Sequence, residues 1–377
     1  MGCTLSLELH HIDLTVNNQR YLDNINLTLE SGAFNVLLGR TLAGKTSLLR
    51  VIAGLDKPTH GKIVLNGEDI TTLAVQKRQV SMVYQQFINY PHMTVWENIA
   101  SPLKLAKVSP SEITRRVSEI AELLHIEDFL QRLPVALSGG QQQRCAMARA
   151  LVKDAQIILF DEPLVNLDYK LRESLRFELK ALFKQRNSIA IYATTEAHEA
   201  LALGGTTILL HQGKVLQSGG ALAQYYQPAN LNAADLYHEP PMNRVTLQVE
   251  NGKWVVPFHH KNLVNVIANG LADGPYQCAI RPDQIALTNK DAEEIALAAK
   301  VDLAEISASE TYLHVSLITP GYADIKWVVH LQGIHNFHYD ADITLFLNLN
   351  SIYVFDQDGS SVCWPESIHL SNTQQAS

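Results

Sequence analysis

The chain has 377 residues, enough for two or three domains with cores of their own. Hydrophobic residues make up 46% and charged residues 18% of it, as in ordinary globular proteins. The net charge of −8 and the lack of a basic tract argue against nucleic acid as a partner. No apolar stretch approaches the roughly 20 residues of a membrane span. The four cysteines form no C-x-x-C pair, which argues against a disulfide framework or a zinc site.

The first part of the chain predicts an α/β sheet. Short alternating apolar runs in residues 5–30 are typical of strands. The apolar run 34–39 ends in glycine, and a helical pattern follows at 46–55. This succession of strand, loop and helix is how a doubly wound sheet begins. Further strands are expected at 63–67 and 80–86.

Residues 94–133 read as helical. One apolar face at helical spacing consists of Ile113, Val117, Ile120, Leu123 and Leu124. Residues 156–163, QIILFDEP, then predict a strand buried on both faces that ends in two acids. An amphipathic helix is expected at 170–186, and strands are expected at 188–194 and 206–219.

The composition changes near residues 226–243, where a Pro-Pro pair and many small polar residues indicate a domain boundary. We therefore expect one domain in residues 1–232 and a second in 233–377. Short strands separated by turn signals fill the second part, which favours a small barrel or sandwich.

Residues 39–47, GRTLAGKTS, match the pattern G-x-x-x-x-G-K-[ST] between the predicted strand and helix. Backbone N–H groups in such a loop surround phosphate oxygens, Lys45 reaches the β- and γ-phosphates, and the Thr46 hydroxyl coordinates Mg²⁺. A glycine turn that merely contains Lys-Thr is the alternative, which the position between strand and helix disfavours. The loop residues expected to bind nucleotide are Gly39, Arg40, Thr41, Leu42, Ala43, Gly44, Lys45, Thr46 and Ser47.

Asp161 and Glu162 end the buried strand predicted at 156–163. An acid at the first position can hold the Mg²⁺ shell, and the second can polarise an attacking water. The alternative is a helix N-cap followed by a glutamate in the first turn.

Residues 137–151, LSGGQQQRCAMARAL, predict a second anion site. Ser138, Gly139, Gly140 and Gln141 open a helix and leave its N-terminal amides bare. A sandwich dimer needs such a turn, because each chain closes over the nucleotide that the other chain's phosphate loop holds.

With these motifs, residues 5–230 resemble the ATP-binding subunits of ABC transporters. GRTLAGKTS resembles Walker A, Gln85 the Q-loop, LSGGQQQR the signature, IILFDEP Walker B, and residues 166–168 the D-loop. The segments IRPDQI, ISASETYLHV and YVFDQDG resemble the C-terminal β-barrel domain of carbohydrate-importer ATPases. Residues 76–103 and 165–173 resemble the paired ATPases of bacterial glycerol importers.

The resemblance implies an α/β P-loop nucleotide-binding domain with a helical subdomain at about residues 88–150, followed by an all-β OB-like barrel. It implies ATP and Mg²⁺ as cofactors, with Thr46, Gln85 and Asp161 around the metal and Glu162, Thr195 and Gln85 in catalysis. The implied partners are a second ATPase, two transmembrane permease subunits and, indirectly, a periplasmic solute-binding protein. The implied location is the cytoplasmic face of the bacterial inner membrane.

The segment after Gln85 would receive a helix of the permease. Its apolar and aromatic residues fit a docking groove, and ordinary core packing is the alternative for half of them. These residues are Phe87, Tyr90, Met93 and Trp96.

Thr195 departs from the family, whose members carry a histidine there that contacts the γ-phosphate. A threonine hydroxyl projects less far, leaves a gap of about one water, and carries no charge near neutral pH. The alternative is that Thr195 is simply a helix N-cap. His198, one turn further on, is a weak candidate to replace the missing imidazole, since its side chain follows its own helix face.

Two other positions also differ from the family. Val16 stands where an aromatic residue usually stacks on adenine, with Tyr21 as the nearest aromatic, and Val165 stands before Asn166 in the D-loop. We therefore expect a slow site on this chain's own phosphate loop and a heterodimer with a related ATPase. The alternatives are a nucleotide-gated regulatory subunit with negligible hydrolysis and an importer ATPase for another solute, such as glycerol phosphate or polyamine. A soluble ABC ATPase of repair or translation fits less well, because the chain has neither a coiled-coil insertion nor a second cassette.

Overall fold

The computed structural model describes residues 5–165, 167–255, 270–289, 294–307, 309–318, 322 and 325–365. The chain divides into two compact units that meet between Leu222 and Ala223. This division lies ten residues before the boundary expected between 232 and 233, and it places residues 223–235, many of them helical, in the second unit.

Two sheets form the first unit. An antiparallel sheet has the order β2-β1-β4-β5. A second sheet has the order β10-β9-β3-β8-β7-β6, and it is parallel except for β10. The strands are β1 (Ser6–Val16), β2 (Gln19–Glu30), β3 (Phe34–Leu38), β4 (His60–Leu65), β5 (Glu68–Asp69), β6 (Val80–Val83), β7 (Ile157–Asp161), β8 (Ile189–Thr194), β9 (Thr206–His211) and β10 (Lys214–Gly220). The predicted α/β fold is thus confirmed, whereas the strands expected in residues 5–30 and 63–67 form the separate antiparallel sheet and do not join the parallel one.

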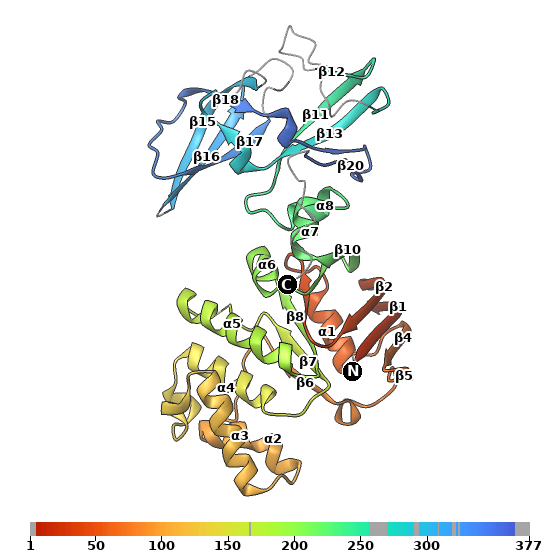
Figure 1. Cartoon of the computed structure of the whole chain (residues 1–377), viewed down its shortest axis with the longest axis vertical. Coiled ribbons are helices and arrows are strands. Elements are labelled where there is room, and N and C mark those ends of the chain that lie inside the picture. The colour runs from red at the N-terminus through yellow and green to blue at the C-terminus, as the bar shows by residue number, and fades with distance from the viewer. Residues whose placement is uncertain are drawn as a thin grey trace. The chain divides into compact units, whose positions relative to one another are not determined.

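Helices cover the parallel sheet and form a separate group of three, α2, α3 and α4 (Figure 1). A capping box of Thr94 and Glu97 begins α2. The predicted apolar face of α3 is buried at Ile113, Val117 and Ile120. The helices are α1 (Lys45–Ala53), α2 (Val95–Leu105), α3 (Pro110–Leu123), α4 (Gly139–Leu151), α5 (Tyr169–Gln185), α6 (Ala197–Leu203), α7 (Ala221–Tyr226) and α8 (Leu231–Asp235). None of the described helices is long and apolar enough to span a bilayer.

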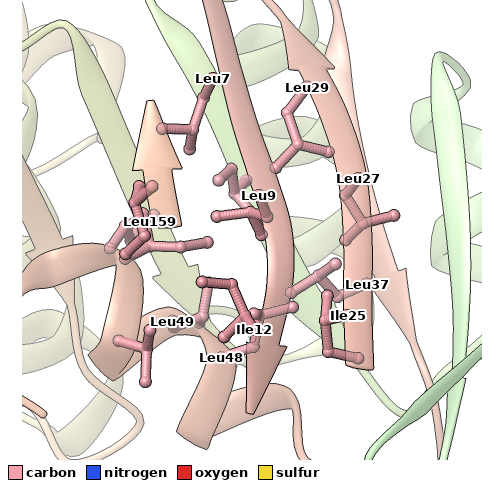
Figure 2. Close-up of a cluster of buried hydrophobic side chains, with 14 of the residues drawn as sticks. Leu7, Leu9, Ile12, Ile25, Leu27, Leu29, Leu37, Leu48, Leu49 and Leu159 are labelled. Carbon is pink, nitrogen blue, oxygen red and sulfur yellow. The ribbon is translucent and has the colours of Figure 1, made fainter. Parts of the chain in front are cut away.

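Every residue of β3, β7 and β8 is buried, because side chains pack on both faces of the sheet. On one face, leucines and isoleucines of β1 and β2 meet Leu37, Leu159 and the α1 residues Leu48 and Leu49 (Figure 2). On the other face, the Phe183 ring of α5 packs edge-on against Phe34 and Phe160. With both faces covered, the strand ends are where polar side chains can gather.

After the helical residues at its start, the second unit is all-β and barrel-like. Its two antiparallel sheets have the orders β12-β11-β13-β19-β20 and β14-β18-β15-β16-β17, and one apolar core lies between them. The Asn243 side chain joins the sheets, since it both donates to and accepts from the Val328 backbone at 2.7 Å. The strands are β11 (Asn243–Glu250), β12 (Lys253–Val255), β13 (Gly274–Ile280), β14 (Ile285–Ala286), β15 (Ile295–Ser307), β16 (Glu310–Leu317), β17 (Lys326–Gln332), β18 (Asp342–Leu347), β19 (Tyr353–Phe355) and β20 (Ser361–Cys363).

Candidate nucleotide site

The phosphate loop runs from the end of β3 to the start of α1. Gly39 packs so closely on β9 that a Cβ there would lie 2.5 Å from the carbonyl oxygen of Leu210. Gly44 has a φ of 104°, which glycine adopts without a steric cost. The Ala43 amide donates to the Arg40 carbonyl at 3.1 Å, and this bond closes the loop.

The remaining loop residues form an exposed tip that leads into a more buried segment. Arg40, Thr41 and Leu42 are exposed, and Leu42 adopts a φ of 67° with 94% of its surface accessible. Ala43 is buried and Ser47 half-buried. The loop thus leaves one side open while its base is fixed against β9.

Lys45 is the buried cation of the site, with only 5% of its surface exposed. Its ammonium donates to the carbonyls of Gly39 at 2.7 Å and Arg40 at 3.2 Å. Burial lowers the pKa of Lys45, and the charge of Glu162 opposes that shift.

Asp161 and Glu162 reach the same place from β7. The Thr46 hydroxyl donates to Asp161 Oδ1 at 3.1 Å. Glu162 accepts from Lys45 at 3.3 Å and, through its other oxygen, from the Gln85 amide at 3.2 Å. The pKa of Asp161 is raised, chiefly by burial. The two acids belong to one cluster with Lys45, Thr46 and Gln85, so a simple helix cap does not describe them.

This cluster fits ATP and Mg²⁺ by its chemistry. Thr46, Asp161 and Gln85 offer hydroxyl, carboxylate and amide oxygens, which are the hard ligands that Mg²⁺ prefers. Lys45 supplies a desolvated positive charge at the N-terminal end of α1, where phosphate groups bind well. In the part of the chain that the structure describes, no group of three or more His, Cys, Asp or Glu residues is placed to hold another metal ion.

The turn Ser138–Gln141 begins α4. The Ser138 hydroxyl accepts from the Gln141 amide at 3.3 Å, and the Gln141 side chain accepts from the Ser138 amide at 2.9 Å. Ser138 and Gly139 are exposed, while Gly140 and Gln141 are half-buried. The turn is therefore fixed by its own capping box and presents its start to solvent.

Gln143 connects α4 to the residue after Glu162, a role that the sequence reading missed. The side chain is fully buried, and its amide donates to the Pro163 carbonyl. Its position within QQQR was the available signal, but three glutamines in succession do not show which one faces inward.

Thr195 does not cap a helix, so that alternative is wrong. The N-cap of α6 is Glu196, and the hydroxyl that accepts from the Glu196 amide is that of Thr194, at 3.0 Å. The Thr194 carbonyl accepts from the Gly39 amide at 3.3 Å, so Thr195 directly follows a residue bonded to the phosphate loop. His198 is half-exposed and lies 3.4 Å from Glu196.

The other departures from the family lie at exposed positions. Val16 is 46% and Val165 44% exposed, whereas Asn166 lies outside the described residues. The Tyr21 carbonyl lies 3.0 Å from the position of a Cβ on Gly44, and its phenol donates to the Gln19 side chain at 3.2 Å. The Tyr21 backbone therefore packs against the end of the phosphate loop.

A cleft of about 450 Å³ opens between β6, α2 and α4. Tyr90 and Met93 line it, together with Leu105. Phe87 lies beside Gly139 of the turn Ser138–Gln141, and the Trp96 ring lies under the Lys104 ammonium at 5.0 Å. Of the four expected groove residues, Tyr90 is exposed and the other three are half-buried, so core packing stays the alternative for Phe87 and Trp96, which do not line the cleft.

Comparison with known proteins agrees with this geometry. Residues 22–165 match the ABC transporter family. The sn-glycerol-3-phosphate import ATP-binding protein UgpC 3 of Rhizobium etli is 37% identical over 332 residues, which is 88% of this chain and 92% of the relative. The spermidine/putrescine import ATP-binding protein PotA of Aggregatibacter actinomycetemcomitans is 36% identical over 291 residues, 76% of this chain and 78% of the relative.

Among solved structures, the dimeric post-hydrolysis state of the ATP-binding cassette MJ0796 bound to ADP and Pi superposes with a TM-score of 0.53. It is 30% identical and covers 57% of this chain and 98% of that one. The chain belongs to the ATP-binding subunits of ABC transporters, which are ATPases that use ATP with Mg²⁺.

Proposed function

We propose that the chain is the energy-coupling ATPase subunit of an importer for a small polyol or sugar, with glycerol as the solute. It works at the cytoplasmic face of the bacterial inner membrane with two permease subunits, fed by a periplasmic solute-binding protein. The UgpC and PotA names place relatives in import of sn-glycerol 3-phosphate and polyamines. The motifs in residues 76–103 and 165–173 support glycerol.

The proposal includes an asymmetric pair of ATPases, and the observation that carries it is Thr195. This residue follows the end of β8, beside the phosphate loop, where a short uncharged hydroxyl cannot reach as far as an imidazole. His198 is paired with Glu196 on the exposed side of α6 and does not replace that imidazole. The site on this chain's own loop therefore binds Mg-ATP and hydrolyses it slowly.

Each residue of the cluster has a part in that site. Lys45 and the loop amides bind phosphate oxygens, and Thr46, Gln85 and Asp161 hold the metal. Glu162 orients and polarises the attacking water. Bound Mg²⁺ supplies charge neutralisation at the phosphates. Thr195 leaves that water less firmly held than a histidine would.

The turn Ser138–Gln141 completes the site of the second ATPase. Its exposed start fits an anion that arrives from another subunit. The capping box takes up the amides of Ser138 and Gln141, so the anion would bind at the two glycines between them. The solved relative MJ0796 is described as dimeric, which supports a two-subunit arrangement.

The cleft lined by Tyr90, Met93 and Leu105 is the docking site for a permease helix. Its walls combine apolar side chains with Arg149, and Tyr90 and Leu105 are both more than one-third exposed. An apolar cleft of this kind suits an amphipathic helix laid into it.

The test compares ATP hydrolysis by the purified chain, by its candidate partner ATPase and by the two together. We expect slow turnover by the chain alone and fast turnover by the pair. In the pair, Glu162→Gln in this chain should change the rate less than the equivalent change in the partner. Fast turnover by the isolated chain that Glu162→Gln leaves intact would refute the slow-site proposal.

Thr195→His tests directly whether the missing imidazole slows the site, and Thr195→Ala is its matched control. The histidine should raise turnover at least several-fold, and the alanine should not. If even the assembled complex shows no hydrolysis in a single turnover, the chain is a nucleotide-gated regulatory subunit instead. Solute choice is tested in proteoliposomes by adding glycerol, glycerol phosphate or spermidine and asking which one stimulates ATP hydrolysis.

A further inference from the structure

Arg281 in the second unit is an unusual buried cation. Only 8% of its surface is exposed. Its guanidinium carbon lies 3.9 Å from the centroid of the Tyr225 ring, 5.1 Å from that of Tyr353 and 5.7 Å from that of Tyr226. One terminal nitrogen, Nη2, donates to the Tyr225 carbonyl at 2.8 Å and also to the Tyr353 hydroxyl.

No anion balances this guanidinium within the described part of the chain. No carboxylate there forms an ion pair with Arg281, and its buried Nε atom has no hydrogen-bond acceptor. Aromatic faces compensate a buried cation only in part, and an unpaired buried charge is costly. The positive charge also reaches His238, whose pKa is lowered to about 3 by burial and by Arg281.

Arg281 lines a pocket of about 310 Å³ whose other polar side chains include a carboxylate, an amide and a hydroxyl. Asp283, Gln284 and Ser351 lie on its wall, and the Ser351 hydroxyl is 3.5 Å from the Gln284 side chain. These groups accept or donate hydrogen bonds but carry only one negative charge. A volume near 300 Å³ is large enough for a small ligand.

We propose that this pocket binds a small anionic polyol, such as a phosphate monoester, with its anionic group on Arg281 and its hydroxyls on Asp283 and Ser351. The guanidinium attracts an oxyanion by its charge and through the N–H groups that Tyr225 and Tyr353 do not take up. The Asp283 carboxylate accepts hydrogen bonds from hydroxyl groups, and it disfavours a bare, highly charged anion. The ring faces of Tyr225 and Tyr226 supply the apolar wall. This site is separate from the nucleotide site and independent of the solute that the importer carries.

The experiment measures binding by isothermal titration calorimetry to the full chain carrying Lys45→Ala, which weakens anion binding at the phosphate loop. The probes are sn-glycerol 3-phosphate, inorganic phosphate and glycerol. We expect one equivalent of sn-glycerol 3-phosphate to bind, inorganic phosphate to bind about tenfold more weakly, and glycerol to give no measurable heat.

Adding Arg281→Met should weaken binding of sn-glycerol 3-phosphate at least about tenfold. Arg244→Met is the matched control, because Arg244 is a half-exposed guanidinium of the same unit that is already paired with Asp235, and it should leave binding unchanged. Unchanged binding in a folded Arg281→Met protein would overturn the proposal, as would the absence of any sn-glycerol 3-phosphate binding.

Two further variants decide the matter if Arg281→Met fails to fold. Ser351→Ala should weaken the binding of sn-glycerol 3-phosphate several-fold and leave the binding of inorganic phosphate unchanged. Asp283→Asn should strengthen the binding of inorganic phosphate, because the variant removes a negative charge from the pocket wall. No effect of either variant, or equal affinity for both anions in the Lys45→Ala chain, would contradict an anionic polyol at this site.

Discussion

The Lys45 ammonium lies 3.3 Å from Oε1 of Glu162, and the Gln85 amide lies 3.2 Å from the other oxygen of the same carboxylate. Glu162 thus joins the phosphate loop to the segment that leads into the helical group α2–α4. Its backbone φ of 48° turns the chain at this point, just after β7 ends. One carboxylate therefore lies between the Lys45 ammonium and the Gln85 amide.

Replacing Glu162 by glutamine should tighten ATP binding about tenfold, or about 1.4 kcal/mol, because the site loses a negative charge that faces Lys45. Hydrolysis at this site should fall at the same time, since the group that we propose to polarise the attacking water is lost. Binding of a fluorescent ATP analogue and phosphate release report the two effects. Glu196→Gln, at a half-exposed carboxylate on the same side of the sheet, controls for a general charge effect. Unchanged or weaker ATP affinity in Glu162→Gln would contradict the prediction.

The ionised Asp161 carboxylate destabilises the folded chain, because burial raises its pKa above the usual value of 3.8. A raised pKa means that the folded state favours the protonated form of Asp161. The stability that this protonated acid contributes is present below pH 3.8 and is lost as the pH rises through the pKa of the folded state. Asp161→Asn should therefore raise the midpoint of thermal unfolding at pH 7 by about 2 °C and abolish Mg²⁺-dependent ATP binding. The gain should shrink as pH falls. A lower midpoint at pH 7 would show that the carboxylate stabilises the fold.

Gly39→Ala should destabilise the chain by more than about 2 kcal/mol, because its Cβ would lie 2.5 Å from a backbone oxygen of β9. The neighbouring backbone atoms cannot move without disturbing the sheet. Gly220→Ala is the matched control, since nothing lies within 4 Å of its Cβ position. Urea unfolding measures both variants, and ATP binding should be lost only in Gly39→Ala. Equal stabilities for the two variants would contradict this account of the loop.

The sequence predicts the parallel sheet and the nucleotide cluster well, because both depend on local signals. The apolar run of β7 and the acids that end it are contiguous, and so are the glycines, lysine and threonine of the phosphate loop. What these motifs do not show is how the groups pair. That Glu162 binds Lys45 and Gln85 together depends on three segments that the sheet brings side by side.

Buried polar residues are what the sequence reading missed. Gln143 meets Pro163 twenty residues away, and Arg281 meets Tyr353 seventy-two residues away. Such residues interrupt no periodic pattern and belong to no local motif, so only the packed structure shows their partners. The alternative that Thr195 caps α6 fails for a related reason. Two adjacent threonines precede the helix, and only the structure shows that Thr194 points inward and accepts from the amide of Glu196, the actual N-cap.

Glu199 explains that direction. This buried carboxylate, only 4% exposed, accepts from the Thr194 hydroxyl at 2.6 Å and from the Tyr192 hydroxyl at 3.1 Å. Burial and the neighbouring Glu199 raise the pKa of Tyr192, so its hydroxyl remains a donor. The network fixes Thr194 at the end of β8 and thereby the residue that follows it.

Glu199→Ala should lower the free energy of unfolding by about 3 kcal/mol, because two buried hydroxyls lose their acceptor. Glu199→Gln keeps an acceptor oxygen and should cost about 1 kcal/mol. In a double-mutant cycle, Tyr192→Phe and Glu199→Ala should show a coupling of about 1 kcal/mol. Glu196→Ala, at the half-exposed carboxylate three residues earlier, should stay within about 0.5 kcal/mol of the parent. Equal costs for Glu196→Ala and Glu199→Ala in urea unfolding would mean that the network does not hold the end of β8.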